Sequence, residues 1–196
     1  MQKLLLAVVA LGLSMAAWSV RADDEVSNTA GYIETDLGHA SLDRAGISFG
    51  PSQTSGISGT TVTGSLLGGY YFDDSFGAEL GYHDFGNPGA FVRTGPAELV
   101  CPAAGFPCPN VTALSASLLG KMEVVPNLDA ILRLGVLSWD VGSSGPITLL
   151  DKTSGQSFLY GIGVRRRFDG GWGLVITYER SAFTTEETRI GVSYSF

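Results

Sequence analysis

Residues 64–86, GSLLGGYYFDDSFGAELGYHDFG, constrain the fold more than any other part of the chain. They are predicted to form two strands joined by a tight turn at Asp73, Asp74 and Ser75. In the second strand Phe76, Ala78, Leu80 and Tyr82 alternate with Gly77, Glu79, Gly81 and His83. Such a period of two residues is typical of a strand whose faces meet different surroundings. The fold must therefore offer this hairpin an apolar side and a polar side.

Composition favours a β-barrel over a helical bundle. The chain has 196 residues, which suits a single domain, and 27 of them are glycine. Hydrophobic residues make up 44% of the chain and charged residues 16%. Beyond the N-terminus, however, no apolar run approaches the ~20 residues that a membrane-spanning helix needs. A glycine-rich chain of low charge without such runs is expected to be all-β.

The N-terminus has the pattern of a secretory signal peptide. Lys3 precedes an apolar block at residues 4–13, and Val20, Arg21 and Ala22 offer a cleavage site of small residues before an acidic start. We expect residues 1–22 to be removed near Ala22, leaving a barrel domain at residues 23–196. An uncleaved membrane anchor is the alternative, but the apolar block is shorter than a bilayer span. Removal of Lys3 and Arg21 leaves 10 basic and 19 acidic residues, a net charge of −9 that argues against nucleic acid as a partner.

The two cysteines agree with export from the cytoplasm. Cys101 and Cys108 lie in CPAAGFPC, within a proline- and glycine-rich segment that shows no strand alternation. In an oxidising compartment the economical interpretation is a local disulfide, worth about 2.5 kcal/mol on the chain-entropy model. A zinc site would need further ligands, and no histidine lies nearby. We expect neither a metal nor a cofactor.

Eight strand-like segments follow one another in the mature chain. They cover residues 31–42, 61–72, 75–86, 111–124, 128–141, 156–168, 172–183 and 187–196. The connections alternate between long and short: residues 43–60, 87–110 and 142–155 are long, whereas 73–74, 125–127 and 169–171 are tight, and the last loop is modest. Short turns at one end, longer loops at the other and an even number of strands are typical of outer-membrane barrels.

The two faces of the strands distinguish a membrane barrel from a soluble one. The last strand carries Ile190, Val192, Tyr194 and Phe196 on one face and Arg189, Gly191, Ser193 and Ser195 on the other. An apolar face toward lipid and a polar lumen predict a closed, eight-stranded, antiparallel, up-and-down transmembrane β-barrel. Aromatic residues near strand ends are expected to form interfacial girdles: Tyr70 or Tyr71, Tyr82, Trp139, Trp172, Tyr178, Tyr194 and Phe196.

Three segments carry a resemblance to a known family. GGYYFDDSFGAELGYHDFG, LRLGVLSW and the terminal IGVSYSF resemble the transmembrane domain of the outer membrane protein A (OmpA) family and its small barrel relatives. The resemblance spans the mature chain and implies a location in the bacterial outer membrane, in contact with lipid and lipopolysaccharide. Tyr194 and Phe196 resemble the signal that the outer-membrane assembly machinery reads. Because the sequence stops at the last barrel strand, anchoring to the cell wall is not expected.

Charged residues on the predicted lumenal face are expected to pair, because unpaired charges in so confined a space are costly. This network comprises Glu34, Asp36, Glu79, Arg133, Arg165, Glu179 and Arg189, with Arg167 near the periplasmic mouth. By the resemblance to the OmpA family, Glu79 and Arg133 fall at positions where that family has interior ion pairs that plug the barrel. Leu118 falls near that family's lumenal lysine, so the family's gating pair is not carried over.

Three functions remain open at this point. The first is a mainly structural barrel with at most weak pore activity. The second is a surface adhesin, or a barrel whose long loops bind a host or phage ligand. The third is an enzyme acting on lipid A, which would need a base such as His39 near Ser41 or His83 beside Asp84. Rims of barrels carry such residues as solvated loop positions, so we expect no catalytic activity.

Overall fold

The computed structural model describes residues 31–48, 53–88, 90–94, 97–100, 110–142, 154–181 and 186–196. The expected signal peptide and the expected disulfide between Cys101 and Cys108 lie outside the described residues, and both stay predictions. In the described part of the chain, no helix is both long enough and apolar enough to cross a membrane.

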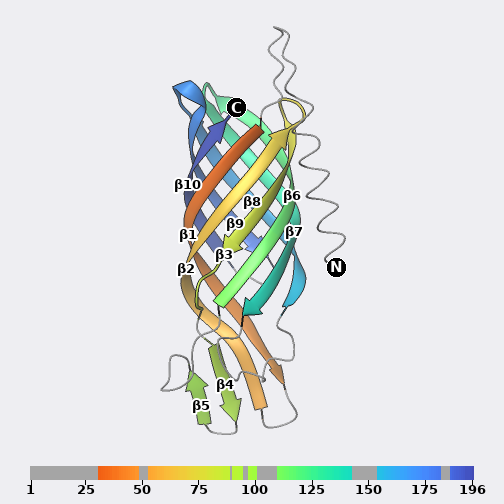
Figure 1. Ribbon diagram of the computed structural model, residues 1–196, viewed down its shortest axis with the longest axis vertical. Helices are drawn as coiled ribbons and strands as arrows, with labels where there is room; N and C mark the ends of the chain where they lie inside the picture. The colour runs from red at the N-terminus through yellow and green to blue at the C-terminus, as the bar shows by residue number, and fades with distance from the viewer. Residues whose placement is uncertain are drawn as a thin grey trace.

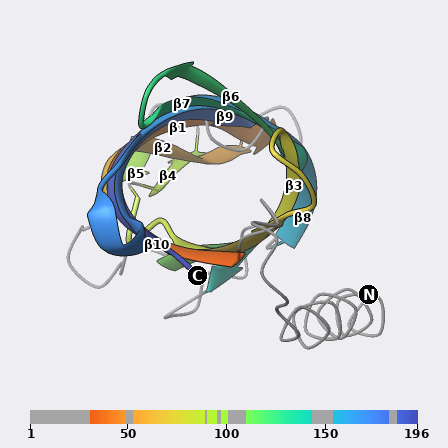
Figure 2. The same ribbon diagram turned by 90° about the horizontal axis from the view of Figure 1, so that it is seen from above.

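Within the described residues, ten antiparallel strands form one sheet, and eight of them close into a barrel. The strands are β1 (Gly31–Ser48), β2 (Gln53–Tyr71), β3 (Phe76–Asp84), β4 (Ala90–Thr94), β5 (Ala97–Val100), β6 (Asn110–Val125), β7 (Leu128–Gly142), β8 (Ser154–Arg167), β9 (Trp172–Ser181) and β10 (Glu186–Ser195). β1 pairs with both β2 and β10, so the ring runs β1, β2, β3, β6, β7, β8, β9, β10 and back to β1. Figures 1 and 2 show the closed ring from the side and from above. The predicted eight-stranded barrel is thereby confirmed.

Tight turns gather at one end of the barrel, which we call the turn end. β2 and β3 are joined by an Asx-type turn, in which the Asp73 carboxylate accepts hydrogen bonds from the backbone N–H groups of Ser75 and Phe76, each at 2.7 Å. β6 and β7 are joined through Asn127, whose φ of 66° lies in the left-handed region that asparagine tolerates. The first and last strands of the ring are joined at the same end, where Gly31 and Phe196 exchange backbone hydrogen bonds of 3.1 and 2.9 Å.

The opposite end, which we call the loop end, contains more strand than the sequence analysis expected. Residues 43–60 were predicted to be a loop, but β1 continues to Ser48 and β2 begins at Gln53, with Asp43 still paired to Ser58. The segment after β3 contains β4 and β5, and β4 pairs with β2. Figure 1 shows these strands projecting beyond the ring. Backbone pairing therefore extends a sheet outside the barrel, where the low sequence periodicity predicted loops.

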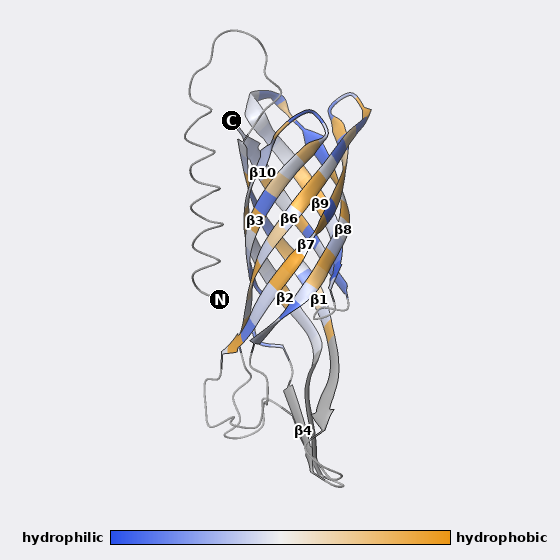
Figure 3. Ribbon diagram, turned by 90° about the vertical axis from the view of Figure 1, so that its right-hand side faces the viewer, coloured by the Kyte–Doolittle hydropathy of each residue, from blue (hydrophilic) through white to orange (hydrophobic). Residues whose placement is uncertain are grey.

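The outer face of the barrel is apolar. Its exposed side chains include Ile33, Leu37, Val62, Leu66, Phe76, Leu114, Leu118, Leu132, Val136, Ile162, Ile176, Ile190 and Val192. Figure 3 shows hydrophobic and hydrophilic residues alternating along the strands. Exposed aromatic residues lie near the turn end, where Tyr194 packs against Trp172 at 5.0 Å and against Phe196 at 6.4 Å between ring centroids. A broad apolar band of this kind is suited to contact with lipid chains.

Candidate functional site

The barrel lumen contains the candidate site, and it has three sections along its length. Near the turn end lies an aromatic section formed by Tyr32, Tyr71, Leu119 and Ile131. The middle is a polar section of buried charged residues: Glu34, Asp36, Glu79, Arg133, Arg165, Glu179, Glu187 and Arg189. Toward the loop end lies an apolar section formed by Ala40, Leu42, Phe85, Val111, Ala113, Leu137, Trp139, Val141 and Leu159.

Arg133 on β7 is the centre of the polar section. Its guanidinium group binds Glu79 through two nitrogens, with Nε 2.7 Å from Oε1 and Nη2 2.8 Å from Oε2. It also forms an ion pair with Glu179 and lies 3.5 Å from Glu34. All four side chains are buried, so water contributes little screening to these pairs. A planar guanidinium is suited to this role because its five donors can serve several carboxylates at once.

Arg165 on β8 connects the polar section to the aromatic section. Its Nη2 donates a 3.1 Å hydrogen bond to Glu34, and its Nη1 lies 3.4 Å from the Tyr71 hydroxyl. The guanidinium group stacks 4.5 Å from the centroid of the Tyr32 ring, and the Tyr32 hydroxyl donates a hydrogen bond to Glu79. Tyr32 and Tyr71 stack on each other with centroids 5.6 Å apart. Cation–π contact and hydrogen bonding thus hold the aromatic section against the charges.

Arg189 on β10 connects the other side of the polar section. Its Nη2 forms an ion pair with Glu179, and its Nη1 donates 2.9 Å hydrogen bonds to Ser65 and to Nδ1 of His83. Its Nε lies 3.6 Å from Asp36, which is longer than a hydrogen bond. Glu187, which the sequence analysis did not include, is also buried here and accepts a 2.8 Å hydrogen bond from Thr63. The alternation of β10 could have identified it, since Glu187 shares a face with Arg189.

His83 is not arranged for base catalysis on its neighbouring serine. Arginine can only donate, so the Arg189 contact makes Nδ1 of His83 an acceptor and places the proton of the neutral ring on Nε2. His83 Nε2 lies 2.8 Å from the Ser115 hydroxyl, and with that proton it donates to Ser115 instead of accepting its proton. His39 is exposed on the outer face, whereas the side chain of Ser41, two residues away, is half-buried. The geometry therefore argues against His83 activating Ser115 as a nucleophile.

Glycines give the large lumenal side chains room. The directly paired positions are Tyr32 with Gly69, Asp36 with Gly191, Arg189 with Gly38 and Trp139 with Gly155. At each of these glycines, a Cβ atom would overlap the side chain opposite. The high glycine content thus serves close packing inside a narrow barrel.

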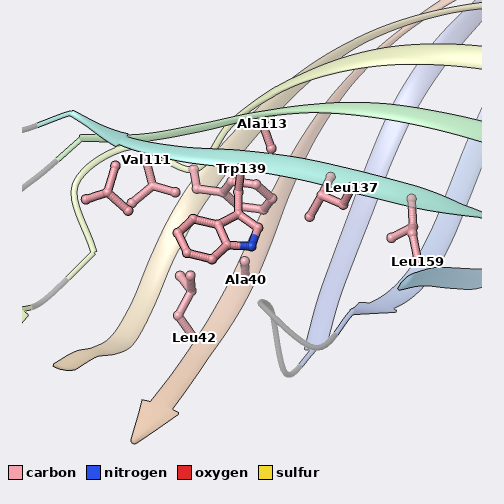
Figure 4. Close-up of a cluster of buried hydrophobic side chains, with 9 residues drawn as sticks. Ala40, Leu42, Val111, Ala113, Leu137, Trp139 and Leu159 are labelled. Carbon is pink, nitrogen blue, oxygen red and sulfur yellow. The ribbon is translucent and has the colours of Figure 1, made fainter. Parts of the chain in front are cut away.

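The apolar section corrects one expectation. Trp139 was predicted to lie in an interfacial girdle, but its side chain is only 4% exposed and packs inside the barrel beside Leu42 and Ala40 (Figure 4). Trp172, by contrast, is 53% exposed on the outer face. The period of two already carried this signal, because Trp139 shares a face with Arg133. The face of the strand, and not nearness to its end, therefore decides where Trp139 lies.

The mouth at the turn end carries its own charges. Arg167 is half exposed and forms ion pairs with Glu123 at 2.7 Å and with the buried Asp129 at 3.2 Å. Lys121 lies 4.3 Å from the centroid of the Tyr71 ring. Leu118, compared above with a lumenal position, is 68% exposed on the outer face. The residues that face the lumen beside it are Ser117 and Leu119.

Within the described ranges, no group of three or more His, Cys, Asp or Glu side chains is placed to hold a metal ion. Most carboxylates of the polar section instead pair with arginines, and the side chains of all three sections are buried inside the barrel. What this arrangement can do chemically is to hold the strands in register through buried ion pairs, with apolar packing on either side of them.

Solved structures support the fold. The chain is similar to OprG of Pseudomonas aeruginosa, with 13% identity over 85% of this chain and 95% of the other and a TM-score of 0.59. It is also similar to Ail of Yersinia pestis, in complex with the heparin analogue sucrose octasulfate, with 13% identity, coverage of 86% and 99% and a TM-score of 0.51. Neisserial surface protein A matches with 16% identity, coverage of 85% and 99% and a TM-score of 0.51.

A search of curated proteins gave no match. The family model for the outer membrane protein beta-barrel domain, however, matches residues 5–196, almost the whole sequence. The ring of antiparallel strands, the apolar outer face and the polar lumen are the features that such a domain requires. The chain therefore belongs to the outer membrane protein beta-barrel domain family.

Proposed function

We propose that this outer-membrane barrel has a mainly structural role and that its lumen is closed to ions. The observation that carries the proposal is the continuous filling of the lumen by the aromatic, polar and apolar sections. An ion crossing the barrel would have to disrupt the pairs of Arg133 and Arg189 and then pass a section lined mainly by buried apolar side chains. Each step carries a desolvation cost of several kcal/mol.

Conductance in planar lipid bilayers tests this proposal. We expect the wild-type barrel to give no sustained open level, and Trp139→Ala to give openings because it removes the largest side chain of the apolar section. Trp172→Ala is the matched control, since it removes the same side chain from the outer face. A sustained open level in the wild-type barrel would refute a closed lumen and would favour the pore.

Surface binding is the second candidate function, and the projecting strands at the loop end favour it. β2 runs beyond the ring to Gln53 and carries β4 and β5 on its edge (Figure 1). Rigid scaffolds commonly present binding segments in this way. Replacing residues 90–100 by a flexible linker of equal length should leave the barrel folded but abolish adhesion to host cells or adsorption of phage. Unchanged binding by a folded variant would argue against this role.

Contacts with lipopolysaccharide and with the outer-membrane assembly machinery complete the proposal. The apolar band on the outer face supports the first, and the exposed aromatic ladder of Trp172, Tyr194 and Phe196 supports the second. We propose Tyr194 and Phe196 as the assembly signal, because both are exposed at the end of β10, the strand that closes the barrel by pairing with β1. The absence of a base for a serine nucleophile at His83 supports a role without catalysis.

A further inference from the structure

The polar section holds more acids than bases. Among the described residues it contains three buried arginines, Arg133, Arg165 and Arg189, and five buried carboxylates, Glu34, Asp36, Glu79, Glu179 and Glu187. The neutral His83 adds no charge. If every group were ionised, the section would carry a net charge of −2 between two plugs of apolar and aromatic side chains. An uncompensated charge in such a place is too costly to persist.

Asp36 is the acid that the protein leaves without a donor. Its side chain is 1% exposed, and neither of its carboxylate oxygens receives a hydrogen bond. By contrast, Glu34, Glu79, Glu179 and Glu187 each accept at least one hydrogen bond from a buried side chain. Asp36 shares the lumenal face with Glu34, and its side chain is one methylene shorter than that of a glutamate.

The charged groups around Asp36 cannot supply the positive charge that would balance its carboxylate. Among the side chains that the structure describes, the one arginine within ion-pair distance is Arg189. Its Nε lies 3.6 Å away, and its other two nitrogens contact Glu179, Ser65 and His83. The other charged groups that act on Asp36 are Glu34 on its own strand, β1, and Glu79 on β3 and Arg133 on β7, with Arg133 already shared by three carboxylates. On the paired strands, Asp36 faces Gly191 and Ser65, which are uncharged.

We propose that the polar section binds a monovalent cation from solution, either a proton or an alkali-metal ion, at the carboxylate of Asp36. A single carboxylate without donors suits such a ligand, whereas a divalent metal would need the several acidic ligands that the described residues do not bring together. If the ligand is a proton, it adds to one carboxylate oxygen and no other bond changes. This binding is a property of the folded barrel, independent of whether the lumen conducts.

Linkage between cation binding and folding provides the test. The folding equilibrium of the wild-type barrel and of Asp36→Asn would be measured by urea titration in lipid vesicles, from pH 5.5 to 9.5, with Na⁺, K⁺ or the bulky cation N-methylglucamine at constant ionic strength. A native state that keeps a proton loses stability as pH rises, by up to tenfold in the folding equilibrium constant per pH unit. An alkali-metal ion bound only to the native state raises that constant by up to tenfold for each tenfold increase in its concentration.

The ratio of the folding equilibrium constants of the wild-type barrel and of Asp36→Asn isolates the contribution of the Asp36 carboxylate. We expect this ratio to change with pH in N-methylglucamine if the ligand is a proton, and with Na⁺ or K⁺ concentration at fixed pH if it is an alkali-metal ion. Asp140→Asn, which changes an exposed aspartate on β7, is the matched control and should leave the wild-type dependence unchanged. A ratio that is constant under all conditions would overturn the proposal, because Asp36 would then be ionised and fully compensated by Arg189.

A second measurement does not depend on the variant folding. Infrared spectra of the wild-type barrel, with and without ¹³C-labelled aspartate, separate a protonated aspartate from any protonated glutamate such as Glu187. We expect an isotope-sensitive band of a protonated carboxyl group at neutral pH, or else a stability that rises with Na⁺ or K⁺. A spectrum without that band, together with stability indifferent to both ions, would also overturn the proposal.

Discussion

The guanidinium group of Arg133 on β7 holds the carboxylate of Glu79 on β3 by two nitrogens, at 2.7 and 2.8 Å, across the intervening strand β6. The same group also pairs with Glu179 and approaches Glu34. These residues lie on β7, β3, β9 and β1, so a single side chain ties together four strands of the ring. Removal of that side chain should therefore affect the whole barrel.

Arg133→Met should destabilise the folded barrel by about 3–5 kcal/mol, because it leaves buried carboxylates without their shared cation. Urea titration of the barrel in lipid vesicles measures this change. Arg180→Gln, which breaks an exposed pair with Glu186, is the control and should cost less than about 1 kcal/mol. Equal losses for the two variants would show that burial adds nothing to the Arg133 network.

Gly69→Ala should cost about 1–3 kcal/mol, because the new Cβ would overlap the Tyr32 ring, which the aromatic section holds in place. The neighbouring change Gly68→Ala provides a matched control, since a Cβ at that position meets nothing within 4 Å. The temperature at which each barrel loses its compact band on a gel in SDS measures the difference. The prediction fails if both variants unfold at the same temperature.

Tryptophan fluorescence should separate the two faces of the barrel. In residues 23–196, Trp172→Phe leaves Trp139 as the sole tryptophan, and Trp139→Phe leaves Trp172. Lipids with brominated acyl chains should quench Trp172 strongly and Trp139 weakly, because Trp172 lies on the outer face and Trp139 lies inside. Strong quenching of Trp139 would show that its side chain lies at the membrane interface, and the apolar section could then not lie in the lumen.

Phe196→Ala should lower the fraction of exported protein that reaches the folded, heat-modifiable form in cells, because Phe196 is the exposed end of the proposed assembly signal. Phe168→Ala removes a similarly exposed phenylalanine near the turn end and serves as the control. Densitometry of folded and unfolded bands in outer-membrane extracts measures the effect. Equal assembly of the two variants would show that no signal resides at position 196.

The fold was accessible from the sequence because a period of two residues reports directly which side of a strand faces lipid. Glu79 and Tyr82, for example, differ by an odd number of positions and lie on opposite faces in the structure. Family resemblance and the alternation of short and long connections pointed to the same barrel, and the family match confirms it. The local sequence pattern suffices to assign the faces of a strand wherever the two faces meet strongly different environments.

Other features depend on three-dimensional distances that no local pattern encodes. That Arg133 takes three carboxylates while Asp36 receives no hydrogen bond depends on side chains from four or more strands. The strands beyond the ring at Asp43 and Ser58 depend on backbone pairing between segments whose side chains show little alternation. Sequence alone placed residues on faces, but it could not assign their partners.

The hydrogen bonds between Gly31 and Phe196 imply that the barrel is completed only when the chain extends through Phe196. β1 and β10 pair from Tyr32 with Ser195 to Ser41 with Glu186, which joins the earliest and the latest strands. A product shortened within β10 would expose two unpaired strand edges to lipid or to another chain. Proteolytic trimming of a few residues at this seam should therefore send the protein to degradation or aggregation, whereas nicks at the loop end should be tolerated.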